Sequence, residues 1–222
     1  SAGVPTSQVA EWVGKAGVRA TKGDSTFKLN VNSCTQAQWD ERFGKQGTIH
    51  AGSTWNVKPW MSNSSFLDGL FFSINRKEFA DKRGVTPSIN YFSDSYMSDP
   101  QNSISYNSTD AHKEAIKGYE TIVDGVSDYG YDYDKAVACF RNAVKELSSQ
   151  GKITLGTKEK PETIKIQVKW MYQTDIKEYG NDIANYFTKA FNDEAVCGGK
   201  VKLEVVEDEV SQDWQKVYDE MM

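Results

Sequence analysis

The chain has 222 residues, of which 38% are hydrophobic and 26% are charged. This composition is typical of a globular protein with a substantial core, and the length allows one large domain or two small ones. The 26 basic and 31 acidic residues give a net charge of −5. Without a basic stripe, this balance argues against a nucleic-acid partner. No run of apolar residues approaches the roughly 18 that a membrane-spanning helix needs.

The first regular pattern along the chain is an alternation of apolar and polar residues over 27–31. It predicts a half-buried strand that ends at Asn32. The stretch that follows, about 33–63, is polar and interrupted by glycines, and its 36–43 portion is a candidate short helix. A connection this long is uncommon unless it folds locally or carries function, so we interpret it as a long irregular insertion.

The stretch 65–84, SFLDGLFFSINRKEFADKRG, is predicted to form one helix of roughly 18 residues. Ser65 and Asp68 have the spacing of a capping box at its start. Gly84 suits the position just after a helix end. Four residues at helical spacing define the face that we expect to be buried: Leu67, Leu70, Phe71 and Ile74.

The stretch 85–130 is the least regular part and is rich in Asn, Ser, Asp and Tyr. We expect a second long irregular insertion there, with one short helix within 109–123. An apolar stripe over 132–151 predicts a well-formed helix. The strand predicted at 163–170, the helix from about Asp175 and the strand at 201–205 follow at the spacing of a βαβ unit with parallel strands.

A last amphipathic helix is predicted to begin at Ser211, and the sequence stops at Met222 within it. A natural domain rarely ends with its apolar stripe still running. We therefore interpret the sequence as a truncated fragment of a longer protein.

Two motifs carry a family resemblance. Residues 74–77, Ile-Asn-Arg-Lys, followed by a glycine and a proline, resemble the signature helix of the oligopeptide and dipeptide solute-binding proteins of ABC transporters, solute-binding protein family 5. Residues 131–136, with Tyr-Asp and Lys-Ala, resemble a second motif of that family, and the motifs occur in its order. The chain departs from the family at Asn75, where Asp is commoner, and at Tyr133, where relatives have Pro.

The resemblance implies a periplasmic-binding-protein-like fold with two α/β lobes. Residues 1–222 would form a single truncated lobe, most of the second, with a small mixed sheet flanked by helices. The implied function is the substrate-binding component of an ABC importer, which holds an extended peptide in the cleft between lobes without a catalytic step or a cofactor. The implied partners are a peptide ligand and ABC permease subunits. Such a protein is extracytoplasmic, monomeric, and either periplasmic or a cell-surface lipoprotein whose lipid anchor lies outside this stretch.

The sequence offers little to catalysis or metal binding. It contains no Gly-x-Ser-x-Gly elbow, phosphate-binding loop or His-Glu-x-x-His motif. His50 and His112 lie in polar, loop-like sequence and are expected to be exposed. The three cysteines fit no zinc pattern; Cys139 is expected in a helix core, and a Cys34–Cys197 disulfide is an open alternative. We therefore expect no catalytic residue and no metal site.

Ligand binding has better support. In open α/β sheets, ligands bind outside the carboxyl ends of the strands, which points to the residues around and after Trp170. The helix that follows offers free N–H groups that suit a carboxylate, and the resemblance implies a basic residue in its first turn. It also implies that the segment 91–106 borders the pocket. The candidate ligand-binding residues are Asn32, Tyr91, Trp170, Tyr172, Gln173 and Lys177. The alternative is a surface loop that holds no ligand.

Two other classes of function stay open at this point. A secreted hydrolase of peptides or glycans is suggested by the many carboxylates and the six tryptophans. A surface adhesin or a signalling receptor could use the same fold without transport. Product formation from peptides would identify the hydrolase, whereas neighbouring genes for permease and ATPase subunits would argue against the adhesin or receptor.

Overall fold

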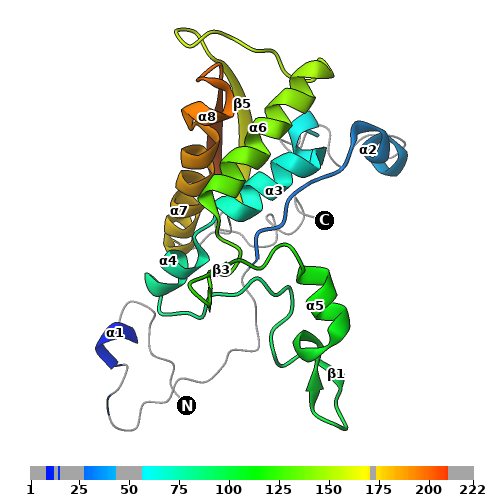
Figure 1. The fold of residues 1–222 in the computed structure, drawn as a ribbon, viewed down its shortest axis with the longest axis vertical. Helices are drawn as coiled ribbons and strands as arrows, with labels where there is room; N and C mark the ends of the chain where they lie inside the picture. Colours follow the sequence, from blue (N-terminus) through cyan, green and yellow to red (C-terminus); the bar gives the residue numbers. More distant parts are fainter. Residues whose placement is uncertain (1–8, 13–14, 16–27, 44–56, 171–173, 210–222) are drawn as a thin grey trace. The chain divides into compact units, whose positions relative to one another are not determined.

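The structure is a computed structural model that describes residues 9–12, 15, 28–43, 57–170 and 174–209. Its internal contacts divide the chain into two compact units. Unit 1 comprises Ser1–Asn30 and Asn75–Tyr131, and unit 2 comprises Val31–Ile74 and Asp132–Met222. Helices and small sheets confirm the mixed α/β class (Figure 1). The lobe of a periplasmic-binding-protein-like fold stays a prediction.

Three helices form the core of unit 2: α3 (Ser64–Ser73), α6 (Tyr133–Ser149) and α7 (Thr174–Phe191). Figure 1 shows α3 alongside α6, and the two helices pack against each other. All three helices meet at Phe66 of α3, Phe140 of α6 and Phe191 of α7, which are fully buried. The three rings meet edge to face, with centroids 5.2–5.9 Å apart, an arrangement that aromatic pairs favour.

The predicted βαβ unit is confirmed. β5 (Glu162–Trp170) pairs in parallel with β6 (Val201–Glu209), from Glu162 opposite Val201 to Trp170 opposite Glu209. α7 and the short α8 (Glu194–Cys197) connect the two strands. Alternate β5 side chains are buried, as the sequence pattern predicted: Ile164, Ile166 and Val168.

The predicted single helix over 65–84 is wrong, because the helix is interrupted at Ile74. α3 ends at Ser73, and Ile74 has extended backbone angles. Asn75 then starts a second helix, α4 (Arg76–Asp81), by accepting a hydrogen bond from the Glu78 N–H at 2.9 Å. An Asn cap is a strong start signal, and it outweighs the continuing apolar pattern. Gly84 does adopt the left-handed conformation expected after a helix end, with φ +64°.

The predicted cap of α3 is also wrong. Asn63, not Ser65, caps the helix, since its Oδ1 accepts from the Phe66 N–H at 2.8 Å. Ser65 lies inside the helix, where its hydroxyl donates to Glu146 Oε1 at 3.4 Å. Glu146 Oε2 also accepts from Asn63 Nδ2 at 2.8 Å. One carboxylate of α6 therefore holds the first turn of α3 from outside.

The buried face of α3 differs from the predicted one. The buried positions are Phe66, Gly69, Leu70, Phe72 and Ser73, whereas Leu67, Phe71 and Ile74 are only half-buried. Only Leu70 was predicted correctly. Gly69 lets α3 approach α6 closely, but glycine and the buried Ser73 add nothing to a hydrophobic pattern. For that reason the sequence pattern alone favoured the wrong face.

Unit 1 is built from short elements. The hairpin of β1 (Met97–Asp99) and β2 (Ile104–Ser105) leads through a 3-10 turn, η3 (Tyr106–Ser108), into α5 (Asp110–Ile116). A second hairpin joins β3 (Ile122–Val123) to β4 (Val126–Ser127). Its turn residues Asp124 and Gly125 both have positive φ, as a two-residue hairpin of this type requires.

Outside these cores, the structure has α1 (Val9–Trp12) in unit 1, and α2 (Gln36–Phe43) and the 3-10 turn η2 (Pro59–Ser62) in unit 2. α2 confirms the short helix predicted at 36–43. The strand predicted at 27–31 is wrong over its described residues 28–31, which pair with no described strand and leave Leu29 and Val31 exposed. The predicted helix from Ser211 lies outside the described residues.

Candidate ligand-binding site

The predicted carboxyl edge of the sheet exists in unit 2. Trp170 is the last residue of β5 and is paired with Glu209, the last residue of β6, so both parallel strands end at the same edge. α7 begins at Thr174, and its first turn contains Lys177. Tyr172 and Gln173 lie outside the described residues. The backbone therefore brings a strand end and a helix start together, with Trp170 and Lys177 on either side of the connection.

Asn32 lies in unit 2, ahead of α2, and is half-buried. Its Oδ1 accepts a hydrogen bond from the Cys34 N–H at 3.2 Å. This contact is a local turn of the kind that Asn side chains form with the backbone two residues on. The side-chain oxygen of Asn32 is thus engaged locally in the structure, and its amide N–H₂ group stays a candidate donor.

Tyr91 lies in unit 1, where the exposed fraction of the residue is 62%. Its ring meets the Phe92 ring edge to face, with centroids 4.9 Å apart and planes at 85°. The Lys28 ammonium lies 3.5 Å from the Tyr91 ring centroid and 5.5 Å from that of Phe92. We call this arrangement of the Tyr91 and Phe92 rings the aromatic corner. It holds a cation against two ring faces.

Further rings pack against Phe92 of the aromatic corner. Phe92 stacks on Tyr96, with centroids 4.4 Å apart, and meets Tyr106 edge to face at 5.5 Å. Asn107 Nδ2 donates to the Phe92 carbonyl at 3.0 Å and to Asp94 Oδ1 at 3.0 Å. Because Phe92 is held on several sides, the orientation of this half of the aromatic corner is set by packing rather than by secondary structure.

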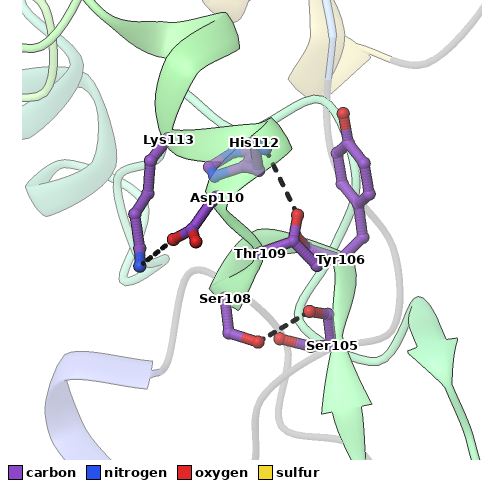
Figure 2. A network of polar contacts seen from close by, with 7 residues as sticks. All are labelled: Ser105, Tyr106, Ser108, Thr109, Asp110, His112 and Lys113. Carbon is purple, nitrogen blue, oxygen red and sulfur yellow. Dashed lines mark hydrogen bonds and ion pairs between the residues drawn. The ribbon is translucent and has the colours of Figure 1, made fainter.

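His112 continues this cluster, as Figure 2 shows for its neighbourhood. The expectation of an exposed loop residue is wrong: His112 lies in α5 and is buried. Its ring meets Tyr106 at 5.5 Å, and its backbone N–H donates to the capping Thr109 Oγ1 at 3.2 Å. Neither ring nitrogen has a hydrogen-bond partner within the described part of the chain. His112 is thus an unusual buried polar ring.

Around His112, α5 is held by short-range polar contacts (Figure 2). Lys113 Nζ donates to Asp110 Oδ1 at 2.9 Å, and this bond lowers the pKa of the Asp110 carboxyl. Ser108 Oγ donates to the Ser105 carbonyl at 2.7 Å. Both of these contacts lie at the solvent-exposed surface, so they order the turn without making a reactive site.

The described residues contain no group of three or more His, Cys, Asp or Glu side chains that could hold a metal ion. The alternative Cys34–Cys197 disulfide is not formed, since all three cysteines are free thiols. Cys139 is half-buried rather than fully inside the core, and desolvation raises the pKa of its thiol. His50 lies outside the described residues.

No protein-family model and no curated protein matches this chain. The solute-binding-protein resemblance therefore stays a prediction from the motifs. Within the described residues, no helix has both the length and the apolar character needed to cross a membrane.

The sequence pointed to Tyr91 but missed the residues that build its surroundings. Lys28, Phe92 and His112 come from separate parts of unit 1 and share no periodic pattern. The only available signal was compositional, since the 91–106 segment is rich in aromatic residues. Such a segment can indicate a binding surface, but its residues are brought together by loops.

Proposed function

We propose that this chain belongs to the second lobe of an extracytoplasmic solute-binding protein that delivers oligopeptides or dipeptides to an ABC importer. The order of the two family motifs in the sequence supports this proposal. The structural observation that carries it is the parallel β5–α7–β6 unit, in which both strands end at the edge where α7 begins.

This edge offers the chemistry that a peptide terminus needs. The N–H groups of the first turn of α7 have no partner within that helix, and the helix dipole favours a negative charge there. A peptide carboxylate is such a charge, and Lys177 adds a cation in the same turn. Trp170, at the end of β5, is the candidate for contact with the peptide's apolar groups. Binding in this way needs no bond to be broken.

The proposed setting follows from the family resemblance. The protein would be periplasmic or a cell-surface lipoprotein, act as a monomer, and present its loaded form to permease subunits of the importer. The other lobe would complete the cleft, because hinged binding proteins enclose a ligand by closing one lobe on the other.

Thermal unfolding of the intact protein that contains this chain tests the proposal. Pools of short peptides should raise the midpoint of unfolding, because a ligand that binds only the folded state stabilises it. Stabilisation by a sugar or a metal chelate, with none by any peptide pool, would reject the proposal.

A pair of lysine variants locates the site. Lys177→Met should weaken binding of a stabilising peptide on the order of tenfold, the effect of losing a charged hydrogen bond. Lys202→Met is the matched control, because Lys202 is exposed near the amino end of β6, away from the proposed edge. Equal effects of the two variants would exclude the first turn of α7 as the carboxylate site.

A further inference from the structure

We infer that the aromatic corner of Tyr91 and Phe92 is a recognition site for an alkylammonium group, and that Lys28 occupies it in this structure. The inference rests on the proposed function for one feature only, namely that the ligand is a peptide carrying a lysine side chain. The corner itself is described entirely within unit 1.

The geometry suits an ammonium ion. A cation is attracted by the negative face of an aromatic ring when it lies within about 6 Å of the ring centroid. The Lys28 ammonium meets this condition for two rings, at 3.5 Å from Tyr91 and 5.5 Å from Phe92. The ring planes stand at 85°, so they form two walls of a cage around one ion. Cages of this kind are how proteins recognise ammonium ligands.

The Phe92 wall is held in place by contacts that do not involve Lys28. Phe92 stacks on Tyr96 and meets Tyr106, and neither ring belongs to the occupying segment. Tyr91 is 62% exposed, so solvent reaches the corner. An accessible aromatic pair with one ring already held by packing loses less freedom on binding than two unsupported rings would.

Lys28 has the features of a replaceable occupant. Residues 28–30 are exposed and belong to no helix or strand. In the part of the chain that the structure describes, Lys28 makes no ion pair, and its cation–π contacts are the interactions that hold its ammonium. A ligand ammonium can therefore take its place while Lys28 returns to water, where an ammonium is well hydrated.

This exchange limits the selectivity that the corner can give. An exposed cation–π contact favours a lysine over an uncharged side chain of the same length by about two- to fivefold, equivalent to about 0.4–1 kcal/mol. Lys28 competes with the ligand and reduces that preference further. Removing the Lys28 charge should consequently strengthen the binding of an external ammonium.

The first experiment uses n-butylammonium chloride as a probe, independently of any peptide. The 222-residue chain is labelled with ¹³C in its tyrosine rings, and the Tyr91 signal is assigned by its loss in Tyr91→Phe. In Lys28→Met, the n-butylammonium concentration that half-saturates the Tyr91 signal should be two- to fivefold lower than in the wild type. Lys117→Met is the matched control, since Lys117 is an exposed lysine of unit 1 paired with Glu114, and it should behave as wild type. A Tyr91 signal that responds no more than to sodium chloride, or equal midpoints in all three proteins, would overturn the inference.

The second experiment uses titration calorimetry to compare two N-acetylated peptides, Ala-Lys-Ala and Ala-norleucine-Ala, on the intact protein that contains this chain, carrying the Lys28→Met change. The lysine peptide should bind two- to fivefold more tightly, and Tyr91→Ala should abolish the difference. The unacetylated norleucine peptide is then compared with its acetylated form. If it binds two- to fivefold more tightly, and Tyr91→Ala abolishes this difference, the corner recognises the peptide's terminal amine and the lysine assignment is wrong.

The two experiments separate this inference from the proposed function. Binding of n-butylammonium, without binding of any peptide by the intact protein, would retain the ammonium site and reject peptide transport. Equal binding of both acetylated peptides, with no response to n-butylammonium, would retain a peptide-binding function and reject the ammonium site.

Discussion

Gly69 of α3 lies directly against the ring of Phe140 of α6. A Cβ atom added at Gly69 would come within 2.5–2.8 Å of three ring atoms of Phe140. Real Cβ atoms essentially never approach other atoms this closely. The absence of a side chain at Gly69 therefore sets how closely the two helices of unit 2 can pack.

Gly69→Ala should destabilise the protein, although the same change normally stabilises a helix. Alanine is better than glycine in a helix by about 1 kcal/mol. Overpacking a well-filled core costs about 1–3 kcal/mol, and the Phe140 ring is itself fixed by two other rings. Because the added Cβ would overlap the ring, we expect the upper part of this cost and a net loss of up to about 2 kcal/mol in chemical denaturation. Gly69→Ala combined with Phe140→Leu should lose less than the sum of the single changes, and strict additivity would show that the contact is not the cause.

Asn63→Asp should destabilise unit 2, even though Asp is normally as good a helix cap as Asn. Asn63 uses both ends of its amide: Oδ1 accepts from Phe66, and Nδ2 donates to Glu146 Oε2 at 2.8 Å. Aspartate would keep the first bond but place a second carboxylate against Glu146. We expect the free energy of unfolding to fall by about 1 kcal/mol at pH 7. Combining Asn63→Asp with Glu146→Gln should recover this stability, because the glutamine can donate a hydrogen bond to the aspartate.

Asn75→Asp is the control for Asn63→Asp. Asn75 caps α4 through its Oδ1, and the first turn of α4 contains Glu78. Aspartate keeps this acceptor and adds a negative charge at a helix N-terminus, which the helix dipole favours. Asn75→Asp should thus leave the unfolding midpoint unchanged or raise it. A marked loss at Asn75 would mean that caps in this protein depend on the amide N–H₂ group.

Acid should weaken the contact between Tyr133 and Asp193. The Ala195 N–H and the Tyr133 hydroxyl both donate to this carboxylate, and they lower the pKa of Asp193 below its usual value of 3.8. Since the folded-state pKa is depressed, the stabilisation is present above pH 3.8 and is lost as the pH falls through the folded value. Tyr133→Phe should be less stable than wild type at neutral pH. The difference in the free energy of unfolding between the two proteins should narrow below about pH 3.8. A difference that stayed constant down to pH 2 would contradict this linkage.

Elements with a clean local period could be predicted from the sequence. β5 alternates strictly, and α6 has an uninterrupted apolar stripe with Asp132 as its cap. Their signals are local, so they do not depend on knowing the neighbours. The parallel pairing also followed, because a strand, a helix and a strand at this spacing leave few other connections.

The break at Ile74 and the buried face of α3 could not be read from hydrophobicity. The apolar pattern continues through Ile74, while the cue to the break is polar: Asn75 with Glu78 three residues later. Phe72 is buried, with 2% of the residue exposed, although the helical period pointed to Phe71. Which of the two Phe side chains is buried depends on the packing of α3 against its neighbours, and the sequence of α3 alone does not show that packing.

Phe72→Ala should therefore cost more than Phe71→Ala. Full removal of a buried Phe side chain costs about 3–5 kcal/mol, whereas Phe71 is half-buried and should cost about 1–2 kcal/mol. Phe72 also carries the Lys135 ammonium 3.9 Å above its ring centroid, which adds a contact to the loss. Urea denaturation of the two variants measures the difference, and a larger loss for Phe71→Ala would restore the face predicted from the sequence.

The aromatic corner escaped prediction for a different reason. Lys28 and Tyr91 are separated by more than sixty positions, and neither lies in a helix or strand. Contacts between loops leave no periodic pattern in the sequence, and the propensities of the individual residues do not indicate which residues they will contact. Composition indicated that the segment is aromatic, but only the structure identifies which cation lies against which ring.

His112→Phe should leave the stability of unit 1 nearly unchanged or raise it. The two ring nitrogens of His112 are buried and have no hydrogen-bond partner among the described residues. Burying such groups without a partner costs about 1–3 kcal/mol, so an apolar ring removes a cost while it keeps the edge-to-face contact with Tyr106. The larger phenyl ring can add about 1 kcal/mol of overpacking, which offsets part of the gain. His112→Ala is the comparison, since it removes the ring as well and should be destabilising. If His112→Phe lost as much stability as His112→Ala, the imidazole nitrogens would have to make a bond that stabilises the fold.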